Sequence, residues 1–422
     1  MPDLPAMFAR PLVLPCGVTL PNRIAKAAMT EALADDAGRP TEAHARLYRR
    51  FVDGGAGLII TGNVMVDGRY LERPGNVIAE DEDVLPSLTR WAETLGGAAA
   101  YTIAQLSHPG RQVQRFVSKT PVAPSAVPAV QFMKSFAAPR ALLEREIEEL
   151  VARFARTASW FRRAGFGGVQ LHGAHGYLIS QFLSPLTNRR DDRWGGSLAN
   201  RARFLVEIVR AVRAATSPGF LLSVKLNSAD FQRGGFAADD SLAVIAMLEA
   251  EGIDLLEISG GNYESPEMFT GADHRRESTQ RREAFFLSFA ERVRAASKVP
   301  IMVTGGFRTA QAMNDALSSG ALDLVGLARP LALEPDLAAR LIAGGDVRSQ
   351  ATQKRFFARK LDMLADGAWY WMQLRRMGQG LDPDPNLGVT RAVLAFLVGD
   401  FLRARRHRRR IAARAQPLLA AP

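Results

Sequence analysis

Residues 144–172 read EREIEELVARFARTASWFRRAGFGGVQLH and contain the unit that decides the fold. The first part predicts an amphipathic helix, because Ile147, Leu150 and Phe154 recur at helical spacing. Gly165 follows where the C-cap of that helix belongs. The closing run GVQLH is short and largely apolar, which is typical of a buried parallel strand. A helix followed by such a strand is the building block of an α/β protein.

Apolar runs of this kind occur eight times, with helical patterns between them. They are residues 24–28, 57–64, 99–106, 168–172, 220–226, 254–258, 300–304 and 322–326. Eight alternating units predict a closed (β/α)₈ TIM barrel rather than an open sheet. Residues Leu12 to Leu20, which turn at Cys16-Gly17, would form an N-terminal hairpin that closes the bottom of the barrel.

The length and composition of the chain fit one large domain and a tail. The chain has 422 residues, of which 47% are apolar, and such a barrel needs about 250 residues. We expect the barrel in residues 1–345 and a helical extension in residues 346–422. Cys16 is the only cysteine, which excludes an intramolecular disulfide and a cysteine-ligated cluster, so redox chemistry would need an organic cofactor. The start MPDLPAMFARP lacks the pattern of a secretory signal, which favours a cytoplasmic protein.

The positive charge of the chain is concentrated at its end. The formal charge is +11, and seven arginines between Arg403 and Arg414 leave only +4 for the rest. A nucleic-acid binder would carry its cations along a folded face, so we expect no nucleic-acid partner. The arginine run follows Thr390 to Leu402, a segment apolar enough for an amphipathic helix. The first interpretation of this tail is a solvated, disordered end, and the alternative is a peripheral contact with anionic lipid. The aromatic segment 369–371 would pack on the barrel or on a second subunit of a homo-oligomer.

Candidate catalytic residues follow the fourth predicted strand, where the active sites of such barrels lie. They are His172, His175 and Tyr177. Two histidines three residues apart suggest a metal, but no carboxylate or cysteine stands at a usual zinc spacing, so we expect none. Two neutral imidazoles can instead bind and polarise a carbonyl oxygen, and a phenol can deliver a proton. The alternatives are a strand-end histidine with satisfied hydrogen bonds and a tyrosine that only packs.

Other strand ends carry side chains suited to a flat, polar ring. Gln105 ends the third strand and offers both donors and an acceptor. Lys225 ends the fifth strand among apolar residues, so an anionic partner is expected. It could serve as a Schiff-base nucleophile or as a cation beside a bound ring. Residues 28–30 end the first strand with a small, a flexible and a hydroxyl side chain.

The last two strands predict a phosphate site. Gly305 and Gly306 follow the seventh strand, before a helix that we expect to begin at Thr309. Backbone N–H groups at such a helix start can bind an anion. Gly326 and Arg329 follow at the end of the eighth strand, which completes the usual phosphate position of these barrels. The alternative is a pair of turn glycines and a surface arginine.

Taken together, the strand ends resemble those of the old yellow enzyme family, across about Leu4 to Gly345. The most specific segment is HGAHGYLISQFLSPLTNRRDDRWGGSLANR, residues 172–201. LPNRIAKAAMTE, LIITGNV, IAQLSHPGRQ, VTGGF and VGLARP support it. The resemblance implies an FMN-dependent reductase that takes hydride from NADH or NADPH and transfers it, through non-covalently bound FMN, to the activated C=C of an α,β-unsaturated carbonyl or related compound.

The resemblance also implies a role for each candidate residue. Tyr177 would donate the proton, while His172 and His175 would hold the oxygen of the substrate. The flavin ring would contact Ala28, Met29, Thr30, Gln105 and Lys225. The ribityl chain and phosphate would contact Ser259, Gly260, Gly305, Gly306, Gly326 and Arg329. Asn63 would also contact the flavin, although it follows Gly62 where relatives often carry a glutamate and then a small residue.

Two other classes of function fit parts of the sequence. A flavin-free barrel aldolase or isomerase would use Lys225 as its Schiff-base amine and the phosphate site for a sugar phosphate. It leaves the segment 172–201 unexplained. A non-enzymatic membrane-surface protein would use only the C-terminal tail, with the barrel as a scaffold. Candidates at every expected catalytic position argue against that class.

Overall fold

The computed structural model describes residues 6–96, 100–129, 135–259, 277–356 and 361–415. Within these residues, eight parallel strands close into a barrel, because the first strand pairs with both the second and the last. They are β3 (Ile24–Lys26), β4 (Leu58–Met65), β6 (Tyr101–Ser107), β9 (Gly168–Gly173), β10 (Leu221–Asn227), β11 (Leu255–Ser259), β12 (Ile301–Thr304) and β13 (Leu324–Leu327). The predicted TIM barrel is confirmed, and each predicted strand overlaps one of these.

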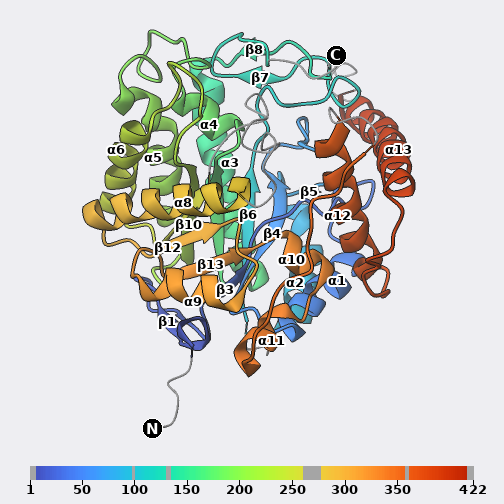
Figure 1. Ribbon diagram of the computed structural model, residues 1–422. Coiled ribbons are helices and arrows are strands. Elements are labelled where there is room, and N and C mark those ends of the chain that lie inside the picture. Colours follow the sequence, from blue (N-terminus) through green and yellow to red (C-terminus); the bar gives the residue numbers. More distant parts are fainter. Residues whose placement is uncertain (1–5, 97–99, 130–134, 260–276, 357–360, 416–422) are drawn as a thin grey trace, which may run out of the picture.

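Helices surround the barrel (Figure 1). They are α1 (Glu42–Asp53), α2 (Leu85–Leu95), α3 (Glu144–Ala164), α4 (Leu178–Leu183), α5 (Leu198–Ala215), α6 (Ala238–Ala250), α8 (Glu277–Ala296), α9 (Ala310–Ser318), α10 (Arg329–Leu333), α11 (Leu337–Ala343), α12 (Asp362–Gly378) and α13 (Val389–Ala415). The helix predicted from residue 144 onward is α3, and it ends as expected. Gly165 caps it with a φ of 99°, a left-handed conformation that glycine adopts without strain.

Five short strands of the described residues lie outside the barrel wall or at its edge. They are β1 (Leu12–Val13), β2 (Thr19–Leu20), β7 (Val122–Ala123) and β8 (Arg140–Ala141), and β5 (Val77–Ile78) extends the sheet beside β4. β1 and β2 form the predicted N-terminal hairpin. Buried Leu14 and Leu20 pack in one cluster with inward-facing Ala25 and Leu58. The hairpin therefore closes the barrel at the end where its strands begin.

The C-terminal extension packs on the barrel. In α12, Trp369, Tyr370 and Trp371 are buried, and the Trp371 indole N–H donates to the backbone carbonyl of Glu31. The aromatic segment thus packs on this same chain.

The interpretation of the basic tail as a disordered end is wrong for the described residues. α13 continues from Val389 through the arginine run to Ala415. Its Asp400 carboxylate accepts hydrogen bonds at 2.9 to 3.1 Å from the buried guanidinium of Arg73. That partner lies more than 300 residues earlier in the chain, so local sequence patterns could not reveal it. Among the described residues, no helix has both the length and the apolar character needed to cross a bilayer.

Candidate active site

Three predicted catalytic side chains lie together at the end of the barrel where its strands finish. His172 is the second-last residue of strand β9, and the loop after the strand brings His175 and Tyr177 back toward its ring. The His172 ring centroid lies 5.1 Å from that of His175 and 4.8 Å from that of Tyr177, both nearly edge to face. His172 and Tyr177 are buried. Two imidazoles and a phenol therefore face one small volume at the mouth.

Both imidazoles are neutral at physiological pH. Burial, together with the charges of His175 and Lys225, holds the pKa of His172 well below its ordinary value. Burial and Lys225 do the same to the pKa of His175. The backbone N–H of Ala174 donates to Nδ1 of His172 at 3.3 Å. A neutral ring that accepts at Nδ1 carries its proton on Nε2, so His172 presents an N–H donor.

The loop holds His175 in an unusual backbone conformation. Its φ is 60°, a left-handed value that is uncommon for a residue with a side chain. The side chain of Asn227 accepts from its backbone N–H at 3.2 Å, and that of Gln112 donates to its carbonyl at 3.0 Å. The ring Nε2 lies 2.7 Å from Oγ of Ser259. Neither Asn227 nor Gln112 was among the predicted site residues, although Asn227 ends strand β10 and so stands at a predicted mouth position.

A buried polar chain crosses the interior of the barrel beneath this cluster. Lys225 forms an ion pair of 2.8 Å with Glu257. Gln170 donates to the other oxygen of Glu257 at 2.9 Å and accepts from Gln105 at 2.7 Å. The anionic partner expected for Lys225 is thus Glu257, a residue that the sequence analysis did not single out. Since Gln105 uses its N–H₂ group on Gln170, its carbonyl oxygen remains the group that can accept from a ligand.

Thr30, after strand β3, is bound to a second residue that the sequence analysis missed. Its hydroxyl lies 3.1 Å from a carboxylate oxygen of Glu72 and 3.3 Å from the amide nitrogen of Asn63. An ionised carboxylate can only accept, so the hydroxyl proton of Thr30 points to Glu72. Burial raises the pKa of Glu72. Ala28 and Met29 precede Thr30 and are half-buried at the same mouth.

The departure at Gly62 has a structural counterpart. Strand β4 shifts register between Ile60 and Asn63. The ammonium group of Lys26 donates to the carbonyl of Ile60 at 2.7 Å, and the hydroxyl of Tyr48 accepts from the N–H of Gly62 at 2.8 Å. A Cβ on residue 62 would collide with the carboxylate of Glu31. Glu31 therefore fills the space that a side chain at position 62 would need.

The predicted phosphate site is a small cavity of about 40 Å³ at the ends of β12 and β13. Gly305, Gly306, Gly326 and Arg329 line it. Helix α9 begins at Ala310, one residue after the predicted Thr309, and the Thr309 hydroxyl caps its first turn. Arg329 forms an ion pair of 2.8 Å with Asp366 of α12, so its charge at the cavity is partly balanced. Gly260 lies outside the described residues.

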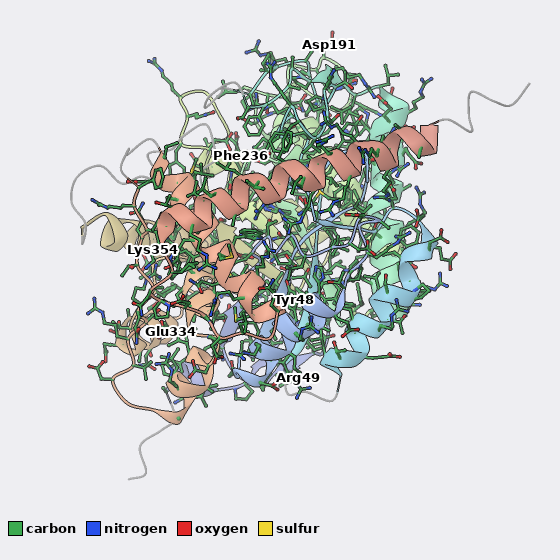
Figure 2. The ribbon with its side chains drawn as sticks, turned by 90° about the vertical axis from the view of Figure 1, so that its right-hand side faces the viewer. Tyr48, Arg49, Asp191, Phe236, Glu334 and Lys354 are labelled. Carbon is green, nitrogen blue, oxygen red and sulfur yellow. The ribbon has the colours of Figure 1, made fainter. Side chains whose placement is uncertain are left out.

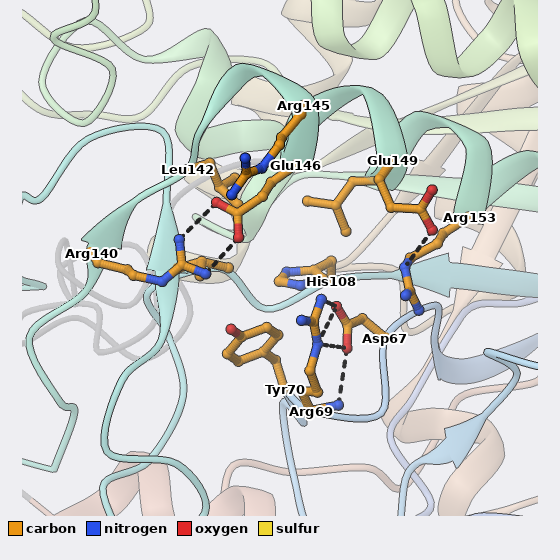
Figure 3. Close-up of a pocket in the computed structure, with 12 residues that line it drawn as sticks. Asp67, Arg69, Tyr70, His108, Arg140, Leu142, Arg145, Glu146, Glu149 and Arg153 are labelled. Atoms are coloured by element: carbon orange, nitrogen blue, oxygen red, sulfur yellow. Dashed lines mark hydrogen bonds and ion pairs between the residues drawn. The ribbon is translucent and has the colours of Figure 1, made fainter. Parts of the chain in front are cut away.

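A larger cavity, of about 290 Å³, lies elsewhere and shares no residue with the predicted site. It lies between the loop after β4, the end of β6 and the first half of α3 (Figure 3). Three of its arginines are engaged, Arg69 with Asp67, Arg140 with Glu146 and Arg153 with Glu149. In the part of the chain that the structure describes, no cluster of metal-ligating side chains was found.

Comparison with known proteins identifies a family of flavin oxidoreductases. The model of the NADH:flavin oxidoreductase / NADH oxidase family matches residues 8–346. An NADH-dependent flavin oxidoreductase, iliE, of Hypocrea jecorina is 38% identical over 367 residues, which cover 81% of this chain and 90% of that protein. A protein of the same name from Neonectria sp. is 37% identical over 77% of this chain, which spans only 46% of that longer relative.

A solved structure agrees at the level of the fold. The old yellow enzyme homologue from Zymomonas mobilis superimposes with a TM-score of 0.68 at 26% identity, over 82% of this chain and 94% of the other.

Proposed function

The chain belongs to the NADH:flavin oxidoreductase / NADH oxidase family, and we propose that it reduces the activated C=C bond of an α,β-unsaturated carbonyl or related compound. FMN is the cofactor of this family and a nicotinamide is its electron donor. The observation that carries the proposal is the cluster of His172, His175 and Tyr177. The neutral imidazoles suit an uncharged substrate oxygen, to which they can donate hydrogen bonds. The buried phenol beside them suits a substrate carbon that must receive a proton.

The residues of the mouth fit the parts of FMN. Gln105 offers an acceptor, and Lys225 a cation, to the pyrimidine edge of the ring. Asn63 has a buried side-chain oxygen with no hydrogen-bond partner among the described residues. The backbone N–H groups of Gly305 and Gly306, before helix α9, suit a phosphate. Ser259 lies beside His175, where it would contact the ribityl chain. Arg329 lines the small cavity with Gly305 and Gly306, where it would contact the phosphate.

FMN supplies hydride transfer, first from the nicotinamide and then to the substrate. The residues of the chain orient the substrate and move the proton. The Nε2–H of His172 would donate to the carbonyl oxygen and draw electron density toward it, with His175 as the second contact. As the β-carbon is reduced, the Tyr177 hydroxyl would give its proton to the α-carbon. Because the hairpin closes the other end of the barrel, nicotinamide and substrate would use the same opening in turn.

The aldolase alternative is weakened by the partner of Lys225. A Schiff base requires a neutral amine, and a carboxylate 2.8 Å away stabilises the charged one. Lys225 is therefore better suited to stabilising negative charge on a reduced ring.

The test is to purify the protein, record its spectrum and identify the released cofactor by mass. We expect FMN, oxidation of NADH or NADPH by an enone, and a saturated ketone as product. A phenol should bind and give a long-wavelength charge-transfer band, because two imidazole donors can hold its oxyanion over the ring. A colourless protein, released FAD or activity lost on chelation would contradict the proposal. If the protein reduced quinones but no enone, its activity would be that of an NAD(P)H-dependent flavin oxidoreductase without C=C reduction.

A further inference from the structure

Helix α13 exposes a row of large apolar side chains to solvent. They are Leu394, Leu397, Val398, Phe401 and Leu402, each 48 to 58% exposed. Spacings of three and four residues place them on one face of the helix. The other face, with Ala392, Val393 and Ala404, is buried against the protein. A contiguous apolar row that stays exposed on a folded protein is a sign of an interaction surface.

The contacts of the buried face hold this row outward. The guanidinium of Arg73 binds Asp400 and lies 4.4 Å from the ring of Trp371 and 3.7 Å from that of Phe396. Further along the helix, Arg410 pairs with Glu80 at 3.2 Å. Figure 2 shows α13 lying lengthwise across one face of the molecule. Since the helix is anchored near its middle and again near its C-terminal end, the row cannot turn inward without breaking the buried Arg73–Asp400 ion pair.

Exposed arginines continue the same face at both ends of the row. Arg391 and Arg405 stand seven residues on either side of Val398, two helical turns away in each direction. Arg408 and Arg409 add further exposed charge beyond Arg405. The only acidic residue of the helix, Asp400, is buried against Arg73. The exposed face therefore consists of apolar side chains flanked by cations.

This charge pattern favours one kind of occupant. In an antiparallel pair of two copies centred near Val398, Arg405 of one copy would face Arg391 of the other. In a parallel pair, the arginine clusters would face each other. Both arrangements set like charges together in an interface of low dielectric constant. An anionic bilayer instead accepts apolar side chains below its headgroups and binds arginines at its phosphates.

We propose that the exposed face of α13 docks this enzyme onto an anionic lipid membrane. The row of five apolar side chains would enter the interfacial layer, with α13 parallel to the membrane plane. The inference does not depend on the proposed reaction, because α13 contributes no residue to the candidate active site.

The test is sedimentation of the full-length enzyme with vesicles of phosphatidylcholine, with and without phosphatidylglycerol. We expect binding to the anionic vesicles that weakens with added salt. Leu397→Glu/Phe401→Glu should weaken it at least about tenfold, because two apolar contacts are lost and two negative charges face the lipid. Val13→Glu is the matched control, since Val13 is 67% exposed on the N-terminal hairpin, and it should bind like the wild type.

Turnover of a soluble substrate should be unchanged in the variants, which shows that the fold is intact. Absence of binding by the wild type would overturn the proposal, as would equal binding by the double variant. Sedimentation velocity without lipid gives a further check. A dimer that the double substitution dissociates, with no vesicle binding, would assign the row to a second copy and also overturn the proposal.

Discussion

The mouth of the barrel and the contact between α13 and the barrel both bury polar side chains, but they use them differently. At the α13 contact, Arg73 and Asp400 bind each other and two aromatic rings cover the guanidinium. At the mouth, His172 uses only Nδ1, and its Nε2 has no hydrogen-bond partner among the described residues. The first arrangement is closed, which is what a structural contact needs. The second keeps a donor for a ligand, which is what a binding site needs.

The largest expected effect tests whether Tyr177 acts as a general acid at the mouth of the barrel. Tyr177→Phe keeps the ring that packs on His172 but removes the proton, so alkene reduction should fall by about 10²- to 10⁴-fold, the usual contribution of a positioned general acid. Flavin reduction by NAD(P)H needs no such acid and should barely change. Stopped-flow measurement of the two half-reactions separates them. Equal slowing of both would mean that Tyr177 only packs.

The second effect tests whether the α13 contact is structural. Asp400→Ala leaves the guanidinium of Arg73 buried without its partner and should cost about 3 to 5 kcal/mol of unfolding free energy. Arg73→Met/Asp400→Leu removes both charges and should recover much of it. Urea unfolding measures both variants, and turnover per folded enzyme should stay near the wild-type value. A loss of turnover larger than the loss of folded protein would show that the two regions are coupled.

The third effect concerns His44, a buried histidine that lies in neither region. Burial lowers the pKa of His44 to about 3, below the ordinary 6.5. The unfolded chain therefore binds a proton that the native state refuses, and stability falls as the pH drops below about 6.5. The loss for this one group is at most about 1.4 kcal/mol per pH unit. His44→Gln should flatten the pH dependence between pH 6.5 and 4, in urea titrations compared with the wild type at each pH. An unchanged slope would place the acid sensitivity at other groups.

The smallest effect returns to the mouth and to Glu72. Glu72→Gln removes a negative charge that lies one hydrogen bond behind Thr30, so the reduced flavin should become more stable. We expect the potential to rise by about 20 mV, which corresponds to about 1 kcal/mol for two electrons. A spectroscopic titration against a reference dye measures it. Glu80→Gln is the control, because it removes the same charge at a position that binds Arg410. The flavin potential of this variant should equal that of the wild type.

The sequence predicted the barrel because buried parallel strands leave a strong local signal. Each strand is a short apolar run, and the runs alternate with helical patterns. The candidate site was predicted from residues that end strands, as Gln105, His172 and Lys225 do, or that follow a strand directly, as His175 and Tyr177 do. Glu72 was missed because it stands in a loop with no periodic pattern. Glu257 was missed because its neighbours across the barrel are set by the closure of the sheet.

The tail shows the opposite limit. Its arginine run resembles a solvated end, because repulsion between neighbouring cations normally opposes compact structure. What makes it a docked helix is the pairing of Asp400 with Arg73 and of Arg410 with Glu80. These partners come from the loops near β5, and no local pattern reveals contacts so distant in the chain.

The adjacency of Glu72 and Arg73 has a consequence for how this protein can evolve. One side chain reaches Thr30 at the mouth and the next reaches Asp400 on the outer helix. A single inserted or deleted residue would exchange their directions, whereas a substitution nearby leaves them in place. Homologues that retain a docked C-terminal helix should therefore vary between residues 67 and 80 in composition but not in length. Lineages that have lost the helix should be the ones in which gaps accumulate there.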